Sequence, residues 1–355
     1  TRPRKMKFST NYLIYPDNRT LERAIADSIG MLSEEVAAAA APDTKVTVAD
    51  SFRYTRGNYE QHRFSSKIFE SLREALEGSL TDKYHDQEPL AWAGTQNKLG
   101  NILAALGQQR RDVELFEQAI QCFSNALEEF RQESSPLEWA ATQYNLGTAN
   151  QALGQLLDAT KPLKIAVDAY TNALLVWTRD EFPQDWMFTM HQLGDTFHAY
   201  GKLLQGNRQF QKSIVAYKNS LAVLDADNYA LALTATHNNR AAALHHLGET
   251  EENPERVEES IRSYEKALTV SMEQQLPIHL AVICRVNKTT AQNVLAALSN
   301  DIGLAEEVAD EFEVIIECFP HALQPLCLRH CEEQMDKARS LTLANSTKGV
   351  EVCRP

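Results

Sequence analysis

Long apolar runs are missing from this chain of 355 residues, and their absence excludes a predicted membrane-spanning helix. No run approaches the roughly 18 apolar residues that such a helix needs. The first ten residues, TRPRKMKFST, are basic, but the apolar core of a signal peptide does not follow them. Because the chain begins with Thr1, we expect it to be processed or to be a fragment, with Met6 as a candidate start.

A surplus of basic residues is also missing, since the net charge is −13. Affinity for nucleic acid comes largely from Lys and Arg, so we expect no nucleic-acid partner. Cysteine is scarce, with six residues that crowd toward the end of the chain. Without a secretion signal, these cysteines are interpreted as reduced thiols, and a cytoplasmic location is predicted.

Catalytic signatures are absent as well. The sequence contains no Gly-rich phosphate loop after a strand, no G-x-S-x-G and no H-E-x-x-H. We therefore predict a protein that is not an enzyme and that holds no cofactor. The dense acidic run GETEENPERVEES from Gly248 is interpreted as a solvated face rather than as a docking site for a basic partner.

What the chain does contain is an internal repeat of 47 residues. Gly107, Gly154, Gly201 and Gly248 are 47 residues apart, and three Trp and three Pro residues follow the same step. A period of this length predicts a stack of equivalent units. Each unit needs its neighbours to bury its apolar face.

Each unit is predicted to form two helices. The first opens with proline at its first position, as at Pro89, and is expected to end at the recurring glycine, as at Gly107, in the C′ position. The second contains a small residue, then an aromatic ring, then a second small residue and Leu, as in AIQCFSNAL. Because this spacing places the small residues and the ring on one face, the two helices can pack closely.

These features resemble the tetratricopeptide repeat family. The resemblance rests on Leu–Gly at 99–100, 146–147 and 193–194, on the glycine that follows, and on the pattern of the second helix. It implies an all-α fold, a right-handed α-solenoid of antiparallel helix pairs with capping helices. The period exceeds the family's usual length of about 34 residues. It is similar to the longer repeats of kinesin light chains and of bacterial signalling arrays.

The repeat register also divides the chain. We expect an N-terminal segment and capping helix at 1–42, a degenerate repeat at 43–87, clear repeats at 88–134, 135–181, 182–228 and 229–275, a degenerate fifth repeat at 276–319, a capping helix at 320–341 and a tail at 342–355. The capping helices would cover the last apolar faces of the array.

The resemblance further implies a groove that faces one side of the first helices. The residues at the family's groove positions are Asn97, Asn101, Tyr144, Asn145, Thr148, Gln151, Phe188, His191, Asp195, His198, Asn238, Asn239 and His245. Amides dominate this set, and an amide both donates and accepts, which suits an extended peptide backbone. An alternative is that amides such as Asn145 and Asn239 bond only to neighbouring helices. Most of the family's basic clamp for chaperone tails is missing.

A second candidate site is the group Cys318, His321, Cys327, His330 and Cys331, whose side chains are of metal-binding types. Their spacing fits no zinc motif with C-x2-C pairs, so packing in the core is the preferred interpretation.

The resulting prediction is a non-enzymatic scaffold or adaptor that binds a protein or peptide segment in the concave groove, with no nucleic-acid or membrane partner. Two alternatives stay open. One is a regulatory or sensor module of an effector enzyme such as a protease or kinase. The other is a metal- or small-ligand-binding protein that uses the Cys/His group.

Overall fold

The computed structural model describes residues 70–71, 73–276, 278–318 and 325–351. The predicted N-terminal segment at 1–42, most of the degenerate repeat at 43–87 and the last residues of the predicted tail lie outside this part. The described residues form helices and connecting loops, without a strand among them. The chain divides into two compact units. Among the described residues, the first unit ends at Val223 and the second begins at Leu224.

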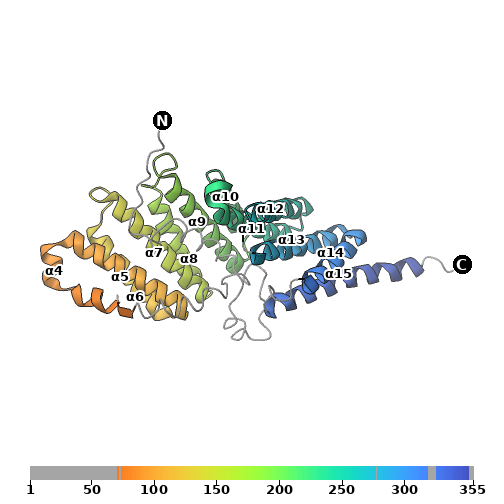
Figure 1. The fold of residues 1–355 in the computed structure, drawn as a ribbon, viewed down its shortest axis with the longest axis horizontal. Coiled ribbons are helices and arrows are strands. Elements are labelled where there is room, and N and C mark those ends of the chain that lie inside the picture. The colour runs from red at the N-terminus through yellow and green to blue at the C-terminus, as the bar shows by residue number, and fades with distance from the viewer. Residues whose placement is uncertain (1–69, 72, 277, 319–324, 352–355) are drawn as a thin grey trace. The chain divides into compact units, whose positions relative to one another are not determined.

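The first unit is a series of antiparallel helix pairs (Figure 1). It contains a helical stretch at 70–71 and 73–79, then α4 (Asp82–Gln87), α5 (Pro89–Arg110), α6 (Val113–Glu129), α7 (Pro136–Leu156), α8 (Thr160–Ala173), α9 (Pro183–Leu204) and α10 (Asn207–Leu221). Each helix contacts the next along the chain from α4 to α10. The proline at the start of α5, α7 and α9 is confirmed as an N-terminal helical residue.

The second unit repeats the arrangement. It contains α11 (Ala226–Thr250), α12 (Pro254–Glu273), α13 (Ile278–Ser299), α14 (Ile302–Cys318) and α15 (Pro325–Glu351). Successive helices are again in contact, and α15 packs on both α14 and α13. The fold is therefore an all-helical stack of pairs, as an α-solenoid requires.

The ends of the first helices correct one prediction. These helices continue two or three residues past the recurring glycine and leave the helix through Arg111, Asp158, Gln205 and Glu252, whose φ angles are 48–53°. The N–H of Asp112 then bonds the carbonyl of Gly107 at 3.0 Å. The glycine is thus the C3 residue of a Schellman motif, not its C′ residue.

Close packing explains why these positions are glycine. A Cβ added at Gly154 would lie 2.7 Å from Cγ of Leu163, at the start of the next helix. The Leu–Gly glycines have the same function about two helical turns earlier, because a Cβ at Gly147 would lie 2.8 Å from the ring of Tyr170. The second helix of each pair therefore rests directly on the backbone of the first.

The core consists of apolar clusters between the helix pairs. One cluster surrounds Phe116 and Phe123, and another surrounds Tyr170 and Trp177, all with side chains at most 2% exposed. Within the described ranges, no helix combines the length and the hydropathy needed to cross a bilayer.

Candidate functional site

The thirteen predicted groove residues are called the inner-face residues below. Thr148, Asp195 and His245 are half-buried. The others are buried, with side chains at most 8% exposed: Asn97, Asn101, Tyr144, Asn145, Gln151, Phe188, His191, His198, Asn238 and Asn239. These mostly polar side chains are therefore largely buried, and the contacts of each one determine which of its atoms can form hydrogen bonds.

Two asparagine pairs connect neighbouring first helices in the same way. Asn145 of α7 donates from Nδ2 to Oδ1 of Asn97 in α5 at 3.1 Å. Asn287 of α13 donates to Oδ1 of Asn238 in α11 at 2.9 Å. Asn145 thus makes the bond to a neighbouring helix that the alternative interpretation requires. Asn239 instead accepts a bond from Asn238 of its own helix at 3.3 Å.

Asn287 is a residue that sequence reasoning missed. Its partner Asn238 lies 49 residues away, whereas the first pair is separated by 48. The fifth repeat has a one-residue slip in register, which hid the equivalence of Asn287 and Asn145. Aligning the fifth unit by its own helices would have identified it.

The tyrosine hydroxyls of the second helices form the other part of the network. Tyr170 donates to Oε1 of Gln151 at 2.8 Å and lies 3.0 Å from Oγ1 of Thr148. Its ring meets the ring of Tyr144 edge-on, with centroids 5.5 Å apart. Burial raises the pKa of Tyr170, so this hydroxyl stays protonated and acts as a donor. Tyr144, predicted as an anchor for a partner, packs in this structure against Tyr170 and Trp177.

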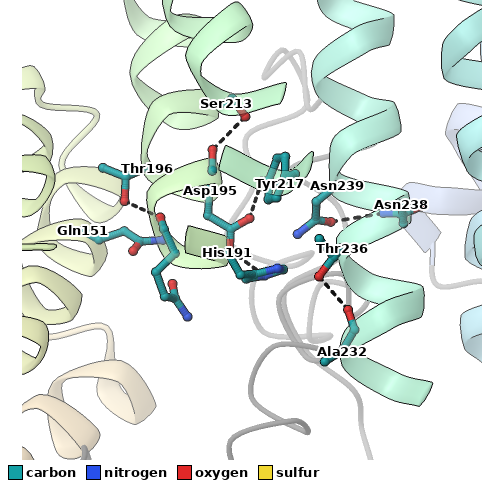
Figure 2. Close-up of polar contacts among 12 residues, drawn as sticks. Gln151, His191, Asp195, Thr196, Ser213, Tyr217, Ala232, Thr236, Asn238 and Asn239 are labelled. Atoms are coloured by element: carbon teal, nitrogen blue, oxygen red, sulfur yellow. Dashed lines mark hydrogen bonds and ion pairs between the residues drawn. The ribbon is translucent and has the colours of Figure 1, made fainter. Parts of the chain in front are cut away.

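The equivalent site in the next repeat contains charge. The hydroxyl of Tyr217 donates to Oδ1 of Asp195, and Nε2 of His191 lies 3.3 Å from Oδ2 of the same carboxylate (Figure 2). The ring of His191 meets that of Tyr217 edge-on, with centroids 5.6 Å apart. His198 packs similarly on Phe210. Sequence reasoning identified Asp195 but missed Tyr217, although the change from Phe123 to Tyr170 and Tyr217 in the repeat register was a usable signal.

Burial changes the acidity of two further groups on α9. It raises the pKa of the Asp185 carboxyl to about 7 and lowers the pKa of the Lys202 ammonium to about 8. Desolvation disfavours the charged form in both cases. The two residues are 17 positions apart, near opposite ends of α9, so they do not form an acid–base pair.

The C-terminal Cys/His group is only partly described. Cys318 is exposed at the end of α14, Cys331 is buried in α15, and His330 lies 3.0 Å from Oγ1 of Thr290 in α13. His321 and the side chain of Cys327 lie outside the described part. Among the described residues, three or more His, Cys, Asp or Glu side chains are nowhere gathered as a metal site. Elemental analysis would test the prediction that the protein holds no metal.

The inner-face residues therefore provide hydrogen-bond donors and acceptors on the first helices, together with one carboxylate. Comparison with known families agrees with the helix pairs. Residues 92–130, which cover most of α5 and all of α6, match the family described as tetratricopeptide repeat. No curated protein matches the chain. The matched segment is therefore similar to one tetratricopeptide repeat, a kind of repeat that generally forms protein-interaction modules.

Proposed function

We propose that the chain is a non-enzymatic adaptor that holds an extended segment of a partner protein against its inner-face residues. One observation supports this proposal above others. Side chains capable of hydrogen bonding return at one position of the first helices every 47 residues, as Asn97, Tyr144, His191 and Asn238. Burying polar groups costs free energy unless they are bonded, so packing alone would favour apolar residues at these positions.

The contacts of the face fit an extended segment. Asn145, Thr148 and Asp195 already engage in bonds of fixed geometry with neighbouring side chains. Such bonds hold polar groups in place before a partner arrives, which lowers the entropy lost on binding. Each bond to a partner backbone is expected to contribute about 0.5–1.5 kcal/mol, so useful affinity needs several repeats together.

Site-specific photo-crosslinking can test the proposal. A photoreactive residue would replace Gln192, which is half-buried beside His191 on α9, and in a second protein would replace Gln121, which is exposed on α6. We expect partner adducts from position 192 but not from position 121. Mass spectrometry would identify both the partner and the segment.

Affinity measurements provide the second readout. The variant Gln192→Ala/Asp195→Asn should weaken binding of the identified segment, while Thr171→Ala on the exposed face of α8 should not. Adducts that form only at position 121, or equal affinity of all folded variants, would contradict an inner-face site. The alternative of a sensor module for an effector enzyme has no specific support among these contacts.

A further inference from the structure

The exposed positions of the second helices change charge from repeat to repeat. Their equivalent first-turn residues are Glu114 in α6, Lys161 in α8, Arg208 in α10 and Glu255 in α12. Two repeats in the middle of an acidic chain are therefore basic where the repeats before and after them are acidic.

Most basic residues of these two repeats lie on α8 and α10, which both contact α9. We define the basic patch as Lys161, Lys164, Arg208, Lys212 and Lys218, all of which are exposed. Helix α10 contains no carboxylate, and α8 contains one, Asp168. None of the five patch residues forms an ion pair with another described residue. Lys212 lies over the ring of Phe197, 5.1 Å from its centroid, which supports its stem.

Helix stability does not account for this charge. The N-terminal turn of a helix has a partial positive charge, so acidic residues stabilise it and basic residues destabilise it. Helices α6 and α12 follow that rule with Glu114 and Glu255, whereas α8 and α10 have no acidic residue in the first turn. The positive charges of Lys161 and Arg208 destabilise the N-terminal turns of their own helices, so helix stability does not explain them and a role outside folding does.

We infer that the basic patch is a second docking surface, which binds a short acidic segment of a partner protein. Carboxylates of such a segment would meet cations that form no ion pair with the described carboxylates, near two helix N-termini that also favour anions. The axial distance from Arg208 to Lys218 is about 15 Å, enough for several residues of a partner. Glu114 and Glu117 on α6 of the same unit limit the patch on one side.

The size of the patch distinguishes a short acidic segment from a long polyanion. Exposed charges act over about 8 Å at physiological ionic strength, so a short segment would respond mainly to the patch. A nucleic acid or an anionic membrane would extend past it and meet a chain whose net charge is −13. The observations therefore favour a protein segment.

The test uses the full chain and a fluorescein-labelled polyglutamate peptide, with binding measured by fluorescence anisotropy at low and high salt. The variant Lys161→Glu/Arg208→Glu installs the residue type that α6 and α12 have at this position. We expect its affinity for the peptide to fall about tenfold or more, because two exposed attractions become repulsions. Its melting temperature should stay the same or rise, since each helix dipole is now complemented. Lys161→Gln/Arg208→Gln should give a smaller loss.

A matched control separates the patch from net charge. Arg131→Glu/Lys266→Glu changes the net charge equally, at exposed positions before α7 and on α12, and should bind the peptide like the wild type. An equal loss in this control, or no loss in the patch variants, would overturn the inference. So would tighter binding of a short DNA duplex than of the peptide, or self-association in sedimentation velocity that the patch variant abolishes. Gln192→Ala should leave peptide binding unchanged, which makes the result independent of the inner-face proposal.

Discussion

Gly194→Ala provides a direct test of the packing between paired helices. A Cβ at this position would lie 2.5 Å from Cε1 and 2.6 Å from Cδ1 of Tyr217. The ring is fully buried, its hydroxyl donates to Asp195, and it meets the ring of His191 edge-on, so it cannot move aside freely. Overpacking of this kind costs about 1–3 kcal/mol. Alanine regains about 1 kcal/mol of helix propensity over glycine.

The net expectation is a loss of up to about 2 kcal/mol in the free energy of unfolding, measured by urea titration with far-UV circular dichroism. Gly94→Ala is the matched control, because it also lies in a first helix but a Cβ there would meet nothing within 4 Å. It should stabilise the protein by up to about 1 kcal/mol. If both variants shift stability in the same direction by the same amount, the contact with Tyr217 does not explain the glycine.

Three further outcomes follow from the contacts. Burial, together with the charges of Lys266 and Arg240, lowers the pKa of His237 to about 4 from its ordinary 6.5. As the pH falls from 6.5 toward 4, the unfolded chain binds a proton at this residue before the folded chain does, so stability that is present above pH 6.5 is lost. His237→Gln should therefore make the melting temperature less dependent on pH between 6.5 and 4. Asn145→Ala removes the donor to Asn97 and should cost about 1–2 kcal/mol, with little further loss on adding Asn97→Ala; additive losses would argue against the bond. Gln205 has a left-handed backbone conformation that glycine adopts without strain, so Gln205→Gly should raise the free energy of unfolding by about 0.5 kcal/mol in thermal melts. A loss of stability would contradict the idea that this backbone is strained.

Much of the local structure could be predicted from sequence spacing. The step of 47 residues and the proline at Pro89 and Pro136 placed the starts of α5 and α7 correctly, because proline at a first helical position has a fixed φ and no N–H to leave unbonded. The same spacing also identified residues such as Asn145 and Asp195, each of which bonds a side chain of another helix in the first unit. It did not identify the tyrosine partners of Thr148 and Asp195, since each tyrosine lies on another helix 22 residues away.

The sequence by itself determined the repeat, the helix pairs and the polar character of the first helices, since these depend on the periodicity of side chains along one chain. Only the tertiary structure decided the rest. It showed that Gly107 and its equivalents are small to admit the next helix rather than to reverse the chain, that Asn145 bonds Asn97, and that the cations of α8 and α10 have no acidic partner among the described residues. Each of these facts concerns distances between atoms on different helices. A linear pattern records which side chains recur, but the packing of one helix on another determines what they touch.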